Sequence, residues 1–65
     1  MRKPFTKHFI DGHIWEDTSA RKYKNKGDAE STAKFYRKQS PGKEYKVIYD
    51  YEENDYIIIR RRKND

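Results

Sequence analysis

Residues 43–62 decide the second half of the fold, and they read KEYKVIYDYEENDYIIIRRR. Hydrophobic and polar residues alternate along this stretch, which is the period-two pattern of a β-strand. The acidic stretch 52–55 is typical of a turn, so the segment predicts a β-hairpin in which Tyr51 pairs with Tyr56. The alternation sorts the side chains onto two faces. One face holds Tyr45, Val47, Tyr49, Tyr51, Tyr56, Ile58, Arg60 and Arg62, and the other holds Lys46, Ile48, Asp50, Ile57 and Ile59.

The segment before this hairpin predicts a helix between Asn25 and Ser40. Asn25 is a suitable N-cap, and Asp28 stands three residues later, where a capping box places an acidic or amide side chain. Ser40-Pro41-Gly42 ends the helix, because proline and glycine do not continue it. An apolar stripe at helical spacing consists of Ala29, Ala33 and Tyr36. Its two small alanines imply that the helix approaches a sheet closely.

The N-terminal part of the chain predicts another β-hairpin, with strands over residues 5–10 and 13–18. Asp11-Gly12 favours a two-residue type I′ turn, in which both central residues need positive φ. This turn sets Lys7 opposite Glu16, a cross-strand charge pair that supports the register. A three-residue loop would shift the pairing by one residue.

These elements predict a single α+β domain over residues 1–65: a small ββαββ domain with an antiparallel sheet and one helix packed on one face. The chain has no Leu, so Ile and the aromatic residues must build the core. The absence of Cys excludes a disulfide framework and a Cys-based zinc site. No apolar run approaches the roughly 20 residues that span a bilayer, and the N-terminus lacks a signal-peptide core. We therefore expect a soluble, cytoplasmic protein.

The alternation leaves open which face of the second hairpin the helix covers. If Ile48, Ile57 and Ile59 face the helix, the face with the tyrosines and arginines is open to solvent. If the tyrosine face is covered instead, the open face is a mixed surface of Lys, Asp and Ile. We favour the first arrangement, which would create a Tyr–Arg platform able to stack bases and hold phosphates.

The net charge of +5, with 16 basic against 11 acidic residues, favours acidic partners such as nucleic acid. We expect a non-enzymatic binding protein that engages nucleic acid, or a nucleic-acid-binding protein or ribonucleoprotein, through a basic, Tyr-rich surface. Neither a cofactor nor a metal is expected, and the chain would act as a monomer or as a homodimer formed through an edge strand. The candidate phosphate contacts are Arg37, Lys38, Arg60 and Arg62, and the candidate stacking or interface residues are Tyr45, Tyr49 and Tyr51.

Catalysis has weaker support in the sequence. His8 and His13 fall on one face of the first hairpin as diagonal neighbours, and paired histidines can act as acid and base or hold a metal. A metal site would need a third ligand, for which Asp11 is the nearby candidate, although a turn aspartate usually bonds its own backbone. An enzyme is therefore the last of three hypotheses.

The small size, the ββαββ plan, the many Lys, Tyr and Ile residues and the absence of Cys resemble small proteins encoded by phages and other mobile elements, among them anti-CRISPR proteins. The pattern over residues 25–36, followed by a hairpin, is also similar to other βαββ modules. The first resemblance implies an inhibitor that blocks a host protein or ribonucleoprotein by direct binding, and it assigns no site residue. In that alternative, the acidic stretch 52–55 would meet basic residues of the partner.

Overall fold

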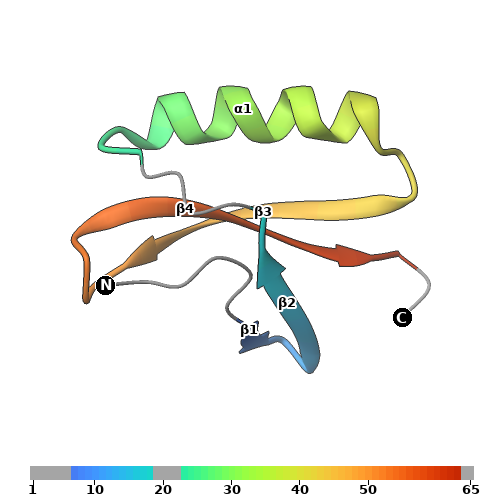
Figure 1. Ribbon diagram of the computed structural model, residues 1–65, viewed down its shortest axis with the longest axis horizontal. Coiled ribbons are helices and arrows are strands. Elements are labelled where there is room, and N and C mark those ends of the chain that lie inside the picture. The colour runs from blue at the N-terminus through green and yellow to red at the C-terminus, as the bar shows by residue number, and fades with distance from the viewer. Residues whose placement is uncertain (1–6, 19–22, 64–65) are drawn as a thin grey trace.

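The computed structural model describes residues 7–18 and 23–63, which form one antiparallel sheet and one helix (Figure 1). The elements along the chain are β1 (Lys7–Ile10), β2 (His13–Asp17), α1 (Lys26–Gln39), β3 (Lys43–Asp50) and β4 (Asp55–Arg62). The strand order in the sheet is β1-β2-β4-β3. The predicted α+β class and ββαββ order are therefore confirmed. Predictions that involve residues 1–6, 19–22 and 64–65 lie outside the described residues.

The first hairpin has the predicted turn and register. Asp11 and Gly12 both have positive φ, at 54° and 78°, as a type I′ turn requires. Lys7 pairs with Glu16 and Phe9 pairs with Ile14, so the two-residue loop is the correct one. This local turn chemistry fixes which side chains share a face of the hairpin.

Helix α1 begins after Asn25 and ends before Ser40, as predicted. The Asn25 side chain makes no bond to a backbone N–H group, and its amide instead donates to the Asp28 carboxylate at 3.4 Å. At the other end, the Ser40 N–H donates to the Tyr36 carbonyl at 2.9 Å. The position of the cap was therefore predicted correctly, whereas the side-chain bonds of a capping box are not formed.

The predicted register of the second hairpin is wrong by two residues. Tyr49, and not Tyr51, lies opposite Tyr56. The Asp50 carboxylate accepts hydrogen bonds from the N–H groups of Glu52 and Glu53, at 3.0 and 3.4 Å, which starts the turn early. Asn54 closes the turn with a positive φ of 55°. Because the shift is an even number of residues, every side chain keeps its predicted face.

The helix covers the tyrosine face, so the favoured expectation of an open Tyr–Arg face is wrong. Ala29 and Ala33 have no solvent exposure and pack against Tyr45 and Ile58. The Tyr36 and Tyr45 rings lie 5.5 Å apart between helix and sheet. The physical reason is packing: the two alanines let the helix lie close to the sheet, and the rings of Tyr36, Tyr45 and Tyr56 complete the apolar layer around Ala29, Ala33 and Ile58.

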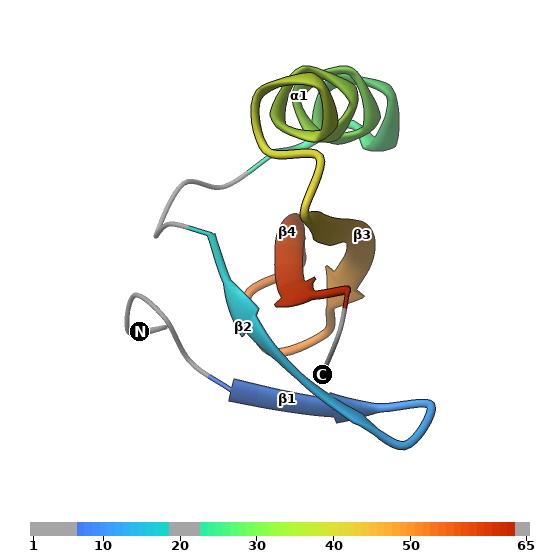
Figure 2. The same cartoon turned by 90° about the vertical axis from the view of Figure 1, so that its right-hand side faces the viewer.

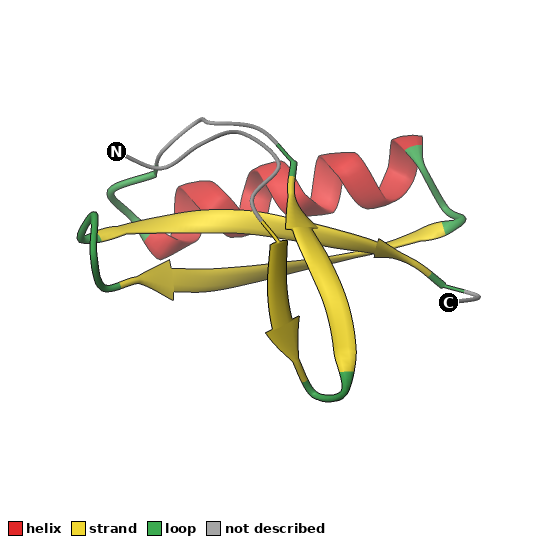
Figure 3. Cartoon of the chain, turned by 60° about the horizontal axis from the view of Figure 1, so that its bottom comes forward, coloured by secondary structure: helices red, strands yellow, loops and turns green. Residues whose placement is uncertain are grey.

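The opposite face of β3 and β4 is covered as well, by the first hairpin. Strand β2 pairs with β4 at Glu16–Arg60 and Asp17–Ile59, and the hairpin then crosses beneath the β3–β4 ribbon (Figures 2 and 3). Trp15, only 6% exposed, packs there on Ile57 and Ile59. The mixed Lys–Asp–Ile surface considered above is therefore not open either. The β3–β4 ribbon is the central layer, with the helix on one side and the hairpin on the other.

Candidate nucleic-acid interface

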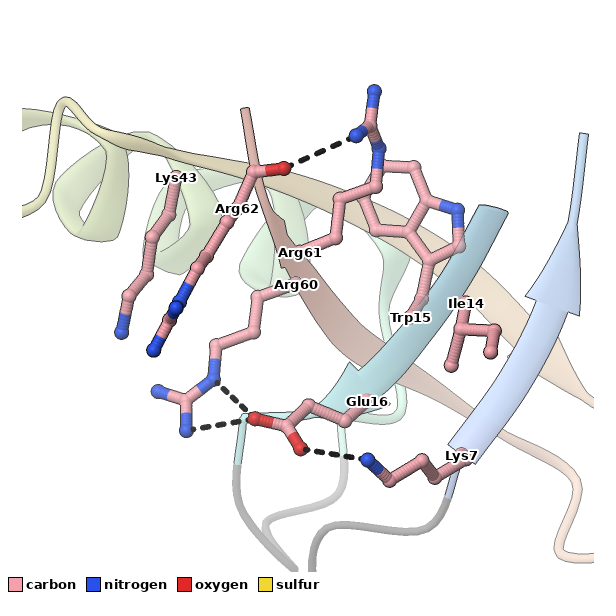
Figure 4. Close-up of a pocket in the computed structure, with 8 residues that line it drawn as sticks. All are labelled: Lys7, Ile14, Trp15, Glu16, Lys43, Arg60, Arg61 and Arg62. Atoms are coloured by element: carbon pink, nitrogen blue, oxygen red, sulfur yellow. Dashed lines mark hydrogen bonds and ion pairs between the residues drawn. The ribbon is translucent and has the colours of Figure 1, made fainter. Parts of the chain in front are cut away.

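Basic side chains gather at the end of the ribbon where β4 ends and β3 begins. Antiparallel pairing sets Lys43 directly opposite Arg62, and Tyr45 opposite Arg60. Strand alternation sends Arg60 and Arg62 to the helix side of the ribbon and Arg61 to the other side. The observed register thus places two cations, Lys43 and Arg62, side by side on one face, and their side chains extend in the same direction in Figure 4.

These residues line a hollow of about 450 Å³ between the two hairpins. We call it the basic hollow. Its lining consists of Lys7, Ile14, Trp15, Glu16, Lys43, Arg60, Arg61 and Arg62. Five cationic side chains therefore meet one carboxylate, which makes the hollow suitable for an anionic ligand.

Glu16 organises two of the cations in the basic hollow. Its Oε1 atom accepts hydrogen bonds from Nε and Nη2 of Arg60, both at 3.3 Å. Its other oxygen, Oε2, lies 4.0 Å from Nζ of Lys7, whose side chain is 71% exposed (Figure 4). Glu16 thus holds the Arg60 guanidinium by two hydrogen bonds, while the mostly exposed Lys7 ammonium lies at the outer limit of ion-pair distance.

Arg61 is held in place by contacts with neighbouring residues of the protein. Its Nη2 donates to Glu44 Oε1 at 2.9 Å, and its Nη1 donates to the Arg62 carbonyl at 3.1 Å. The guanidinium also lies 5.4 Å from the centre of the Trp15 ring, a cation–π distance. With 11% of its side chain exposed, Arg61 closes the wall of the hollow and anchors the first hairpin.

Lys43 and Arg62 differ from these neighbours. Within residues 7–18 and 23–63, no carboxylate lies within ion-pair distance of either side chain. Like charges directly opposite each other on a sheet face destabilise the pairing. An anion bound between the Lys43 ammonium and the Arg62 guanidinium would remove this repulsion.

A second hollow of about 310 Å³ adjoins the first, and Lys43 lines both. Arg37 and Lys63 supply its other cations, and Glu44 its carboxylate. Arg37 is fixed there because its Nη2 donates to the Tyr45 carbonyl at 2.9 Å. We use the name basic track for the cationic side chains, other than Arg61, that line the two hollows: Lys7, Arg60, Arg62, Lys43, Lys63 and Arg37.

The basic track contains three of the four predicted phosphate contacts, namely Arg37, Arg60 and Arg62. Lys38 is exposed in the last turn of α1 and lines neither hollow. Lys43 was missed because the predicted register placed Tyr45 opposite Arg62. The signal that would have found it is Asp50, whose side chain sets the turn and therefore the register.

Of the predicted aromatic residues, only Tyr45 borders the basic track, as one of the residues that line the second hollow. Tyr45 is 9% exposed beneath the helix, so its ring is unavailable for stacking, and its proposed role as an exposed anchor is wrong. Tyr49 and Tyr51 lie toward the other end of the β3–β4 ribbon, and Tyr49 is roughly 20 Å from Lys43 along β3 at the usual rise per strand residue. Tyr51 is 84% exposed and makes an edge-to-face contact with Tyr49, with ring centres 4.9 Å apart.

The register places the two histidines as diagonal neighbours on one face of the hairpin, and His8 has Asp17 as a bonding partner. His8 Nε2 is bonded to Asp17 Oδ1 at 2.8 Å, and Asp17 has no solvent exposure. His13 stands beside the turn, opposite Ile10. No cluster of three or more His, Asp or Glu side chains that could hold a metal ion occurs within the described ranges.

Comparisons with known proteins give no match that bears on the fold or the site. No protein-family model, no curated protein and no solved structure matches the chain significantly. Across the described residues, α1 is the only helix, and it is too short and too polar to cross a membrane.

Proposed function

We propose that this chain is a non-enzymatic binding protein that holds the phosphate backbone of a nucleic acid along the basic track. The Lys43–Arg62 pair supports this proposal most directly. The two cations face each other across neighbouring strands, which costs stability in the free protein. A phosphate bridging them would turn that repulsion into two charge-assisted hydrogen bonds.

The arrangement of the remaining cations fits the same ligand. Arg60 and Lys7 lie on one side of the Lys43–Arg62 pair, and Lys63 and Arg37 lie on the other. Cations that are distributed over two hollows sharing Lys43 suit a polyanion with several charges better than they suit a single small anion. Backbone contacts of this kind position a nucleic acid and do not read its sequence.

Charge reversal tests the proposal. A Lys43→Glu/Arg62→Glu variant should lose most of its affinity for a labelled DNA strand in fluorescence anisotropy. Across about 50 to 200 mM salt, the slope of log K against log salt should become shallower by roughly 1.4, or 0.7 for each lost phosphate contact on a single strand. The fold should survive, since the variant replaces one like-charged pair with another.

A matched control separates local contacts from net charge. Lys26→Glu/Lys34→Glu makes the same charge change on exposed positions of α1, outside the basic track. This control should keep the wild-type salt slope. If both variants weaken binding equally, the affinity reflects overall charge and the assignment of the basic track is wrong.

A second candidate function rests on the opposite end of the ribbon. Tyr51 and Tyr49 are exposed there beside the acidic turn residues Glu52 and Glu53. Exposed tyrosines with acidic neighbours suit the basic nucleic-acid-binding surface of another protein, as an inhibitor of the phage type would require. Affinity purification with and without nuclease distinguishes the two candidates, because a protein partner remains after nuclease treatment and a nucleic acid does not.

A further inference from the structure

An exposed apolar pair lies next to the basic hollow. Phe9 is 75% exposed and Ile14 is 62% exposed, and the two residues are directly opposite each other in the first hairpin. Strand alternation puts them on the same face as Lys7 and Glu16, the side turned away from Trp15. The hairpin thus buries one face on the ribbon, and its other face presents Phe9 and Ile14 to solvent beside Lys7 and Glu16.

This apolar pair is continuous with the cations. Ile14 itself lines the basic hollow together with Arg60 and Arg62. Phe9 is not among the residues that line the hollow, but directly opposite residues of a hairpin have Cβ atoms about 5 Å apart, so Phe9 lies next to Ile14, which does line it. A ligand that fills this surface must present an apolar face toward Phe9 and negative charge toward the arginines.

A nucleotide of a single strand has both parts. Its base has a flat apolar face that stacks on aromatic side chains, and its phosphate is an anion. In a duplex the base faces are stacked on one another and are unavailable to a side chain on an open sheet face. The combination of Phe9 with the cations therefore discriminates between the two forms.

We propose that the protein binds single-stranded nucleic acid, with a base stacked on Phe9 and Ile14 and the adjoining phosphates held by Arg60, Arg62 and Lys43. This inference rests on the proposed function and adds the form of nucleic acid that is recognised. Stacking explains why a Phe and an Ile remain exposed beside a charged hollow in so small a domain.

Four labelled probes test it by fluorescence anisotropy: oligothymidylate, oligouridylate, an abasic deoxyribose-phosphate strand of equal length, and a DNA duplex. The wild-type protein should bind at least one of the two oligonucleotides more tightly than the abasic strand and the duplex. Whichever of the two oligonucleotides binds more tightly shows whether the protein prefers DNA or RNA. Equal affinity for the abasic strand would overturn the inference, because stacking would then contribute nothing.

The Phe9→Ala variant should lose about 5- to 50-fold in affinity for the preferred oligonucleotide, as expected for one lost stacking contact. Its affinity for the abasic strand should stay unchanged, and Phe9→Tyr should restore stacking. Phe35→Ala is the matched control, because Phe35 is 55% exposed on α1 and lies outside the hollow. Unchanged oligonucleotide binding by Phe9→Ala would overturn the inference.

Two combinations of results distinguish failure of the proposed function from failure of the single-strand inference. If no probe binds with salt dependence, and Lys43→Glu/Arg62→Glu changes nothing, the proposed function itself has failed. If all probes bind equally and the charge reversal abolishes their binding, only the single-strand inference has failed. Sedimentation of Phe9→Ala adds a third outcome: conversion of a dimer to a monomer, with unchanged oligonucleotide affinity, would assign the apolar pair to self-association and overturn the inference.

Discussion

His8 Nε2 lies 2.8 Å from Oδ1 of Asp17, a carboxylate with no solvent exposure. The two residues belong to neighbouring strands of the first hairpin, and Asp17 is also one of the residues that join this hairpin to β4. The bond therefore connects the edge strand β1 to the junction that holds the two halves of the domain together.

Removing this bond should destabilise the domain. His8→Ala deletes a partner of a buried carboxylate, a loss that typically costs about 1–3 kcal/mol. Urea unfolding followed through the fluorescence of Trp15, the single tryptophan, measures the change. His8→Gln, whose amide can still donate to Asp17, should recover part of the stability, and His13→Ala serves as the control. A loss in His13→Ala as large as that in His8→Ala would argue against a specific role for the bond.

The type I′ turn gives a second prediction. Gly12 has a φ of +78°, a region that residues with a Cβ atom rarely adopt, although a Cβ placed there would meet no neighbouring atom within 4 Å. Gly12→Ala should therefore cost about 1–2 kcal/mol through backbone strain alone. Gly42→Ala provides the comparison, because Gly42 has equally open space and no positive φ. Equal stability of the two variants, measured by thermal unfolding, would contradict this account of the turn.

Packing beneath the helix can be tested at Ala33, which has no solvent exposure and faces Tyr45 and Ile58. Ala33→Leu adds three carbon atoms to a filled layer and should destabilise the domain by about 1–3 kcal/mol. Ser31→Leu makes a comparable increase on the exposed side of the same helix and should have little effect. A neutral or stabilising Ala33→Leu would mean that the layer between helix and sheet is not tightly filled.

Tyr51 distinguishes the two candidate functions. It is exposed at the far end of the ribbon from the basic track, so Tyr51→Ala should change affinity for oligonucleotides by less than about twofold. If the chain instead acts by blocking a host protein, the same variant should lose at least tenfold in affinity for that partner, as truncation of an interface tyrosine commonly does. Parallel titrations of the variant against both ligands decide between these outcomes.

Features governed by neighbouring residues were predictable from the sequence. Asp11-Gly12 fixed the first turn and its register, and the Ser40-Pro41-Gly42 stop fixed the end of the helix. The register of the second hairpin was missed because the Asp50 side chain bonds two backbone N–H groups and starts the turn before the acidic stretch. That error also concealed the pairing of Lys43 with Arg62.

Features that depend on distant parts of the chain were not predictable in the same way. Alternation assigns residues to two faces but treats those faces equally, so it did not reveal that tyrosines pack under the helix. Nor did it indicate that Trp15 would cover the opposite face and leave Phe9 outside. Arg60 and Arg62 were identified through their charge, whereas the hollow that they line exists only because the first hairpin crosses the ribbon.

The basic hollow spans the junction between the two hairpins, so binding of a ligand there would be linked to the stability of the fold. Lys7 and Ile14 come from the first hairpin, while Lys43 and Arg62 come from the second. A ligand held by both sides would act as a clamp, since separating the hairpins would require its release. At a free ligand concentration 100 times Kd, this linkage adds about 2.7 kcal/mol to the free energy of unfolding. In a chain of only 65 residues, a ligand bound in this way would contribute to stability by holding the two hairpins together.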